Sequence, residues 1–581
     1  MIRKVYKVAI TAFAVCGMAV PLAAQDIAQI AKSDPLIITG SVGTQNTYHY
    51  SSQSNGYASP FSSMIYANLN VSLYGINMPF AISYSNSNWS YNYPHFTFSL
   101  SPTYKNWTGY LGQNTMTMSN YVMNMGFNGV GVEYNSDRIR SGAFYGVLRK
   151  AINDDPTDPM ARSPQLKRMG WGFKVGYGSK RNYLDLYLLR AYDCPNSVDE
   201  TWRSRVTPQE NIVVGVRGGV APLKWLSFTA NAAMSVFNTD KQAPMVELTE
   251  AEGLDKIFPT RMSSLSRFAG DANMNLSFAG INASVTYRLV QPDYTSLGTY
   301  YMSNNYHSIG MSLSSVIARR VALSATFSGQ ADNLTKRQLY TTKGFIFGAT
   351  ASTRIGQHFN LAASYNGYLQ NQSDGTLIVT DSSRVHRQMM SFTVTPSYNI
   401  SSEKLDHTVM LSTAYSTNKD LNKFATGVSD VNSLSMGLTY DVGVKPWEMN
   451  FTASFNHQQS NGYKSTYRSE IASLGVNRSF LEEKNLNVNL TGTLCYNEVK
   501  YQMKSLSMGG NVGLSYTLKK VHAFTAQASF NKYGDVNITK TRSHLDDTDI
   551  SANLSYVYTF TLLQIKSKKN RVQSDDKNKK K

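Results

Sequence analysis

The most regular feature of the sequence is an alternation of apolar and polar residues along segments of about ten residues. Three segments illustrate it, apolar face first: Val321, Leu323, Ala325 and Phe327 against Ala322, Ser324, Thr326 and Ser328; Leu486, Val488, Leu490 and Leu494 against Asn487, Asn489, Thr491 and Cys495; Phe524, Ala526, Ala528 and Phe530 against Thr525, Gln527 and Ser529. A membrane-spanning β-strand needs about 9–11 tilted residues, with apolar side chains toward lipid and polar ones toward the lumen. The pattern therefore predicts an all-β chain that folds as a transmembrane antiparallel β-barrel.

The polar faces of these segments are rich in Ser, Thr, Asn and Gln. Burying such side chains without hydrogen-bond partners in a dry core costs too much free energy. The interior of the barrel is therefore expected to be wet, or to be occupied by a polar partner.

Short turns alternate with longer connections, as periplasmic turns and outer loops do in barrels of this kind. Short turns are predicted near Gly75-Ile76-Asn77, Lys105-Asn106, Ser136-Asp137, Ser179-Lys180, Pro222-Leu223, Ala318-Arg319, Gly356-Gln357, Ser402-Glu403, Lys445-Pro446, Glu482-Glu483 and Lys519-Lys520. Longer loops are predicted around 52–63, 152–167, 195–208, 241–265, 371–385, 418–430 and 534–547.

This rhythm breaks once, because a single strand over 272–290 would place the 291–304 loop on the periplasmic side. Dividing the segment at Ala279-Gly280-Ile281 restores the order. Both ends of the barrel then lie on the periplasmic side. The sequence thus predicts about 26 strands, within a range of 24–26, near the upper part of the range for single-chain bacterial barrels.

The N-terminal residues predict the cellular compartment of the protein. Arg3, Lys4 and Lys7 precede an apolar stretch, and the segment ends in small residues, which is typical of a secretory signal peptide over 1–25. The predicted organisation continues with a short periplasmic segment over 26–35, the barrel over 36–562 and a basic periplasmic tail over 563–581. These ranges place the protein in the bacterial outer membrane and leave no room for an N-terminal plug domain.

A barrel of this size has a wide lumen, since 26 strands tilted by about 40° enclose a cylinder roughly 50 Å across. Without a plug of its own, the lumen is expected to be closed by inward-folded loops, by a flattened cross-section or by a separate protein. The size therefore predicts a protein partner that plugs the barrel or docks on it.

Composition supports the barrel and excludes other classes. Only 16% of the residues are charged and 12% are aromatic, against about 25% charged residues in an average soluble domain. The mean hydropathy of −0.31 excludes a bundle of membrane helices. The formal net charge of +18 does not indicate nucleic-acid binding, because no such motif accompanies the scattered basic residues.

The end of the chain carries two further signals. Leu554, Tyr556, Tyr558 and Phe560 share one face of the last strand and resemble the aromatic-terminated signal that barrel-assembly machinery recognises. A basic tail follows, with Lys566, Lys568, Lys569, Arg571, Lys577, Lys579, Lys580 and Lys581. It would dock on anionic lipid headgroups or on an acidic partner; the alternative is a solvated, disordered end.

The sequence predicts no catalytic site, metal site or cofactor. The nine His residues are dispersed without zinc-ligand spacing. Asp154, Asp155 and Asp158 are interpreted as an acidic surface turn in preference to a Ca²⁺ site. Aromatic residues near strand ends are typical of interfacial girdles, but Tyr300 and Tyr301, with Asn304 and Asn305, fall in a predicted outer loop and suggest a contact there.

Three sets of stretches resemble a group of large, poorly characterised outer-membrane barrels of Bacteroidota. They are LSPTYKNWTGYLG (100–112) with GVGVEYNSDRIRSGAFYG (129–146), PDYTSLGTYYMSNN (292–305), and GQADNL (329–334). The resemblance implies an envelope barrel and defines no substrate.

Two functions fit these expectations. The first is a transport or translocation pore with a protein partner that closes the lumen. The second is a structural platform that anchors a surface or periplasmic envelope complex. A barrel enzyme fits less well, because an active site at a barrel rim requires far fewer strands.

Overall fold

The structure is a computed structural model that describes residues 34–52, 60–86, 96–153, 163–246, 258–380, 382, 384–424, 427–481, 483, 485–500, 503–535 and 547–565. The predicted signal peptide lies outside the described residues, as does most of the segment that follows it.

The described residues form one antiparallel sheet of consecutive strands. The strands are β1 (Leu36–Ser51), β2 (Phe61–Leu73), β3 (Ile76–Ser85), β4 (Phe96–Leu100), β5 (Thr103–Tyr104), β6 (Trp107–Asn114), β7 (Phe127–Asn135), β8 (Ile139–Arg149), β9 (Lys167–Gly178), β10 (Tyr183–Cys194), β11 (Glu210–Leu223), β12 (Leu226–Asn238), β13 (Ser264–Phe278), β14 (Ile281–Val290), β15 (Tyr306–Ile317), β16 (Val321–Asp332), β17 (Tyr340–Ile355), β18 (Phe359–Asp374), β19 (His386–Ser401), β20 (Leu405–Asp420), β21 (Val431–Val444), β22 (Met449–Gly462), β23 (Ser465–Phe480), β24 (Leu486–Val499), β25 (Met503–Leu518), β26 (His522–Asp535) and β27 (Asp547–Ile565).

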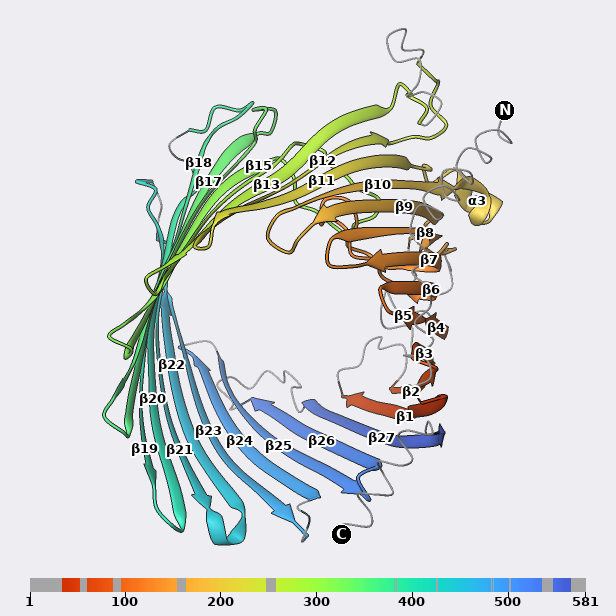
Figure 1. Cartoon of the computed structure of the whole chain (residues 1–581). Coiled ribbons are helices and arrows are strands. Elements are labelled where there is room, and N and C mark those ends of the chain that lie inside the picture. The colour runs from red at the N-terminus through yellow and green to blue at the C-terminus, as the bar shows by residue number, and fades with distance from the viewer. Residues whose placement is uncertain are drawn as a thin grey trace.

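The sheet closes on itself, because β1 pairs with β27 from Leu36↔Ile565 to Ser51↔Asp549. Figure 1 shows the resulting ring of strands, with β27 beside β1. The short segments β4 and β5 both pair with β3 and with β6, so they are two parts of one strand. The described chain is thus a closed antiparallel barrel of 26 strands, as the sequence predicts.

The interruption between β4 and β5 has a local cause. Pro102 lies between them, and Pro79 lies in the neighbouring strand β3. Proline has no backbone N–H to donate to a ladder, so it is found at strand edges and irregularities. The backbone N–H of Ser101 donates to the Pro79 carbonyl (3.1 Å) and keeps the two segments in one sheet.

Most of the predicted turns are confirmed. The division of 272–290 is correct: β13 ends at Phe278, β14 begins at Ile281, and Ala279 and Gly280 between them have φ values of 51° and 79°. The turn predicted at Pro222-Leu223 is misplaced, because β11 continues to Leu223 and the connection lies at residues 224–225. A register shift between Val220 and Leu223 accommodates Pro222 within the strand.

We call the end of the barrel with the short turns the turn side and the opposite end the loop side. The first strand starts and the last strand ends on the turn side, with β27 continuing to Ile565, three residues beyond the expected boundary at 562. The loop side is not uniformly long, since only residues 463–464 separate β22 from β23.

Helical structure in the described part of the chain is limited to α3 (Glu200–Arg203) and the 3₁₀ turns η1 (Pro195–Ser197) and η2 (Lys445–Trp447). No helix among these residues has the length and apolarity to cross a membrane.

The barrel has two structurally different parts. We call β6–β14, with the connections between them and residues 291–305 that follow β14, the packed sector, and β15–β27 the polar sector. Apart from Val379, every buried apolar residue of the described chain lies between Met116 and Leu297. The core therefore belongs to the packed sector, although the sheet is continuous around the ring.

Candidate functional site: the lumen wall

The lumen face of the polar sector is lined mainly with uncharged polar side chains. Hydroxyl groups pair across neighbouring strands, as in Ser324 with Thr350 (2.6 Å) and Ser529 with Ser551 (2.6 Å). The opposite face carries exposed apolar residues such as Leu323, Phe327 and Leu490. This arrangement confirms the predicted alternation and gives lipid an apolar surface and the lumen a hydroxyl-rich one.

The lumen face of the packed sector carries ionic groups instead. Lys174 Nζ lies 2.6 Å from Glu133 Oε1, and both side chains are less than 10% exposed. The Tyr110 hydroxyl donates to the same carboxylate (2.6 Å). Arg140 donates to Asp185 through Nε (2.9 Å) and Nη2 (2.7 Å). Charged groups held this way stiffen the wall, because each ion has partners that replace water.

Two connections fold inward over this wall, residues 115–126 between β6 and β7 and residues 291–305 between β14 and β15. We call them the inward loops. The Tyr294 hydroxyl donates to the Tyr121 carbonyl (2.8 Å), and the Ser296 hydroxyl donates to the Val122 carbonyl (2.6 Å). Burial raises the pKa of both tyrosine hydroxyls, and for Tyr121 the Asp271 carboxylate raises it further, so both stay protonated donors.

The inward loops are also bonded to the strands beneath them. Ser119 Oγ donates to Asn231 Oδ1 (2.7 Å), and Leu297 N donates to Asn211 Oδ1 (3.1 Å). Lys174 Nζ, already paired with Glu133, donates to the Thr117 carbonyl (3.1 Å). These partners lie on β9, β11 and β12. The two inward loops are therefore bonded to the packed sector and make the barrel wall thicker there.

Close packing beneath the inward loops requires glycine at particular points. A Cβ added at Gly298 would lie 2.4 Å from Leu189 Cδ2 and 2.8 Å from the Val122 carbonyl oxygen. Real Cβ atoms do not approach other atoms this closely, so any side chain at 298 would push the two inward loops or the wall apart.

The four residues suggested for an outer-loop contact lie in the second inward loop but have different surroundings. Tyr300 and Tyr301 are 62% and 82% exposed. Asn305 is buried; its Oδ1 accepts from Leu334 N (2.9 Å) and its carbonyl accepts from Asn333 N (3.0 Å). Asn304 Nδ2 lies 3.5 Å from the Tyr294 carbonyl. Asn305 thus has structural partners, and a contact role for the four residues stays a prediction.

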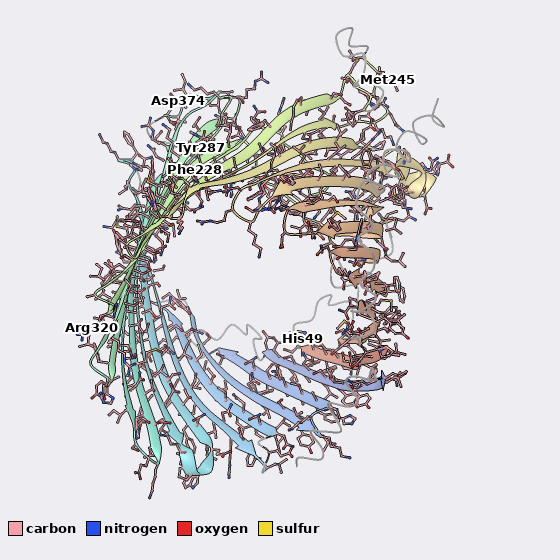
Figure 2. All side chains as sticks on the ribbon, viewed as in Figure 1. His49, Phe228, Met245, Tyr287, Arg320 and Asp374 are labelled. Atoms are coloured by element: carbon pink, nitrogen blue, oxygen red, sulfur yellow. The ribbon has the colours of Figure 1, made fainter. Side chains whose placement is uncertain are left out.

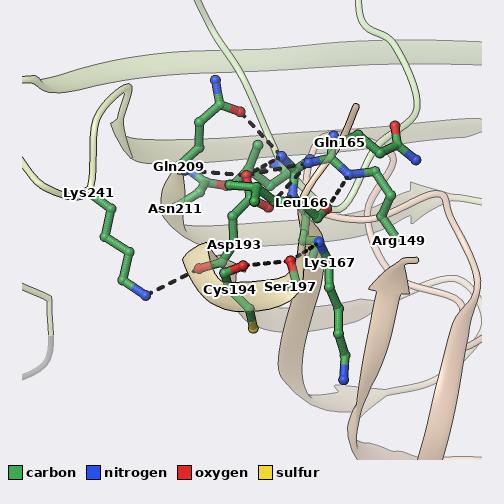
Figure 3. A network of polar contacts seen from close by, with 12 residues as sticks. Arg149, Gln165, Leu166, Lys167, Asp193, Cys194, Ser197, Gln209, Asn211 and Lys241 are labelled. Atoms are coloured by element: carbon green, nitrogen blue, oxygen red, sulfur yellow. Dashed lines mark hydrogen bonds and ion pairs between the residues drawn. The ribbon is translucent and has the colours of Figure 1, made fainter. Parts of the chain in front are cut away.

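A second polar network lies at the loop-side rim of the packed sector (Figure 3). Asp193, which is 1% exposed, accepts from Arg168 Nε (2.7 Å) and from Arg149 Nη2 (3.4 Å). The backbone N–H of Gln209 also donates to Asp193 (3.3 Å). Nearby, buried Glu210 accepts from Arg261 Nε (3.2 Å). This rim is fixed by its own internal ion pairs.

The residues of the predicted assembly signal lie together on the outer face of β27. Tyr558 stacks on His522 with ring centroids 4.7 Å apart, and Tyr556 stacks on Phe524 at the same distance. Leu554 is 56% exposed. Recognition by assembly machinery stays a prediction, and the whole basic tail from Lys566 to Lys581 lies outside the described residues.

The first inward loop was not foreseen in the sequence. The sequence feature that marks this loop is the stretch 114–126, in which Met116, Met118, Met123 and Met125 flank Tyr121 and Val122. Methionine is flexible and fills irregular gaps in cores. Such a cluster between two strand patterns is therefore more typical of a packed segment than of a solvated loop.

Among the residues that the structure describes, no group of three or more His, Cys, Asp and Glu side chains could hold a metal ion. Cys194 and Cys495 are both free thiols. Asp154, Asp155 and Asp158 lie outside the described part of the chain.

No family model matches this chain, and no curated protein matches it. Solved structures of barrels are similar to it at low identity. The P pilus usher (PapC) translocation pore has 9% identity and a TM-score of 0.36, with 90% of this chain and 100% of that chain covered. OccK8 (OprE) of Pseudomonas aeruginosa has 10% identity and a TM-score of 0.31, and OccAB2 of Acinetobacter baumannii 10% and 0.30, each with 68% of this chain and 98% of that chain covered. Likeness at this level says nothing of function, and the resemblance to Bacteroidota barrels stays a prediction.

Proposed function

We propose that the protein is an outer-membrane pore for transport or translocation, whose lumen is closed by a protein partner. The observation that carries this proposal is the lumen face of the polar sector. Thr326, Asn511 and Gln527 point into the lumen and are exposed, and none of them is charged. Such a surface is wetted by water and offers polar solutes or an extended polypeptide exchangeable hydrogen bonds.

The partner is supported by the size of the ring and by the course of the inward loops. A 26-strand barrel is roughly 50 Å across. The hydrogen bonds of the inward loops given above go to one another or to the wall of the packed sector, except those of Asn305, which joins the adjoining connection at Asn333 and Leu334. None of them reaches the opposite wall. In Figure 2 the described side chains leave the centre of the ring free.

Single-channel conductance of the full-length protein in planar bilayers tests this proposal. Recordings are made before and after a wash that strips co-purified proteins. We expect a large conductance that appears only after the wash. A large conductance before the wash would support the pore but contradict the proposal that a protein partner closes it.

The alternative function is a structural platform that anchors a surface or periplasmic complex. The specific observation in its favour is a group of exposed apolar side chains on the loop side, described below. The absence of conductance both before and after stripping would favour the platform over the pore.

A further inference from the structure

Three neighbouring connections on the loop side of the polar sector expose apolar side chains. They are residues 333–339, 375–385 and 421–430. We call their exposed apolar residues the apolar loop patch: Leu339 (55% exposed), Leu377 (48%), Ile378 (84%), Leu421 (39%), Phe424 (63%) and Val428 (62%). Asp374, labelled in Figure 2, marks the start of the middle connection on the outside of the ring.

Hydrogen bonds to backbone carbonyls join the three connections into one surface. Thr376 N donates to the Gln338 carbonyl (2.9 Å), which links the first to the second. Asn422 Nδ2 donates to the Arg384 carbonyl (2.8 Å), which links the second to the third. The apolar side chains are therefore presented together by connected loops.

The conformation of the middle connection turns apolar side chains outward although it also buries one. Val379 is 4% exposed, and its N–H donates to Asp374 Oδ1 (2.8 Å). The adjacent Ile378 is 84% exposed. Because the loop is anchored at Val379, exposure of Ile378 is a feature of a fixed conformation.

The patch stands clear of the lipid. Strands β17, β18, β19 and β20 are 16 residues long, whereas about 9–11 residues cross the membrane. On their outward faces the positions nearest the loops are polar: Thr341, Lys343, Asn371, Ser373, His386, Gln388, Thr417 and Lys419. This polar collar separates the patch from the apolar band, so lipid tails do not explain the exposed residues.

The charges around the patch indicate the chemistry of what covers it. Lys336, Arg337, Lys343, Lys419 and Lys423 are exposed. The four acidic residues that the structure describes here accept backbone N–H groups: Asp332 from Thr342 (2.5 Å), Asp374 from Val379 (2.8 Å), Asp420 from Asn422 (3.0 Å) and Asp430 from Asp420 (2.8 Å). Asp332, Asp420 and Asp430 are partly buried and Asp374 is exposed. Among the described residues, five exposed basic side chains therefore face one exposed carboxylate around the apolar centre.

We propose that the apolar loop patch is a docking surface for a protein whose contact segment combines apolar side chains with Asp and Glu. Contiguous exposed apolar residues rimmed by polar ones are typical of protein interaction sites. Complementary charge at the border would orient the partner and speed its association. This inference goes beyond the proposed pore, because docking on the loop side does not require the lumen to conduct.

Site-specific photo-crosslinking in the native cells tests the proposal. A photoreactive phenylalanine analogue replaces Ile378 or Phe424 in the full-length chain, and the crosslinked peptides are identified by mass spectrometry. We expect the same protein from both positions, through a segment that contains apolar and acidic residues. The matched control position is Met262, which is 75% exposed on the loop side of the packed sector and is expected to give no crosslink to that protein.

Two variants sharpen the test. With the analogue at Val428, the double change Ile378→Asp and Phe424→Asp should lower the crosslink yield at least tenfold, and Lys336→Glu with Lys423→Glu should lower it severalfold. Met245→Asp with Met262→Asp should leave it unchanged. Heat-modifiable mobility on gels verifies that each variant is folded. If a variant does not fold, the crosslinked peptides from the analogues at Ile378 and Phe424 still test the proposal.

The proposal is overturned if both positions give crosslinks only to lipopolysaccharide, only to a second copy of this chain, or to nothing. Equal loss of yield in the Met245 and Met262 control would also overturn it, because the effect would then not belong to the patch.

Discussion

The packed and polar sectors are built from the same strand pattern and differ in what covers the lumen face. In the packed sector the inward loops bury that face, so that Val213 and Ser235 are 0% and 1% exposed. In the polar sector Thr326 and Gln527 lie open. The comparison teaches that a period-2 pattern determines which side chains face inward, but not whether they meet water or protein.

The connections on the loop side follow the same division. In the packed sector they place Val198 and Phe258 under cover (3% and 5% exposed), whereas in the polar sector they leave Ile378 and Phe424 exposed. The packed sector thus covers part of its loop-side apolar surface, although Met245 and Met262 are exposed (67% and 75%). In the polar sector, three connections that are hydrogen-bonded to one another expose the six residues of the apolar loop patch, which is the basis of the proposed docking surface.

The largest expected effect comes from placing a charge on the lumen face of each sector. Ser235 Oγ donates to the Thr295 carbonyl (2.6 Å) beneath an inward loop. Ser235→Lys should therefore destabilise the barrel by on the order of 5 kcal/mol, since it buries an unpaired charge and overfills the space. Thr326→Lys should cost less than about 0.5 kcal/mol, because its ammonium reaches water.

Guanidinium unfolding of both variants in phospholipid vesicles measures the difference. Phe327→Lys is the control for the lipid face and should cost about 2–4 kcal/mol near the midplane. Equal losses for Ser235→Lys and Thr326→Lys would show that the two lumen faces do not differ as described.

The next largest effect concerns ion pairs. Glu133 pairs with Lys174 where both are nearly buried, so Glu133→Ala leaves a buried ammonium without its carboxylate and should cost about 3–5 kcal/mol. Glu498 pairs with Lys504 (3.4 Å) where the side chains are 26% and 38% exposed. Glu498→Ala should cost no more than about 1 kcal/mol.

The same unfolding assay compares the two, and Lys174→Met in the Glu133→Ala background serves as the control. Lys174→Met removes the unpaired buried ammonium and should recover part of the lost stability. A Glu133→Ala variant as stable as Glu498→Ala would contradict the ionic support assigned to the packed sector.

The sequence determined more of the polar sector than of the packed one. Strand number, the division at Ala279-Gly280 and the lumen-facing residues of β16 and β26 follow from local alternation and turn chemistry, because each depends only on neighbouring residues. The pairing of Asn305 with Asn333, or of Tyr294 with Tyr121, depends on contacts between loops far apart in the chain. No local pattern encodes them, although the methionines of 114–126 mark one of the loops.

The smallest expected effect is one in which the two sectors respond with opposite sign. At Gly298 a Cβ would collide with Leu189 and with the Val122 carbonyl, whereas at Gly492, in β24 of the polar sector, nothing lies within 4 Å of the added atom. Gly298→Ala should therefore destabilise the barrel by about 1–3 kcal/mol through overpacking. Gly492→Ala should stabilise it by about 0.5 kcal/mol, since alanine loses less conformational freedom than glycine in a strand.

Guanidinium midpoints of the Gly298→Ala and Gly492→Ala variants, measured side by side, give the sign of each change in stability directly. Gly510, which also has nothing within 4 Å, provides a second position at which the gain should recur. If Gly298→Ala were neutral, the inward loops would not be packed against the wall as tightly as the contact with Leu189 requires, and the distinction between the two sectors would lose its main geometric support.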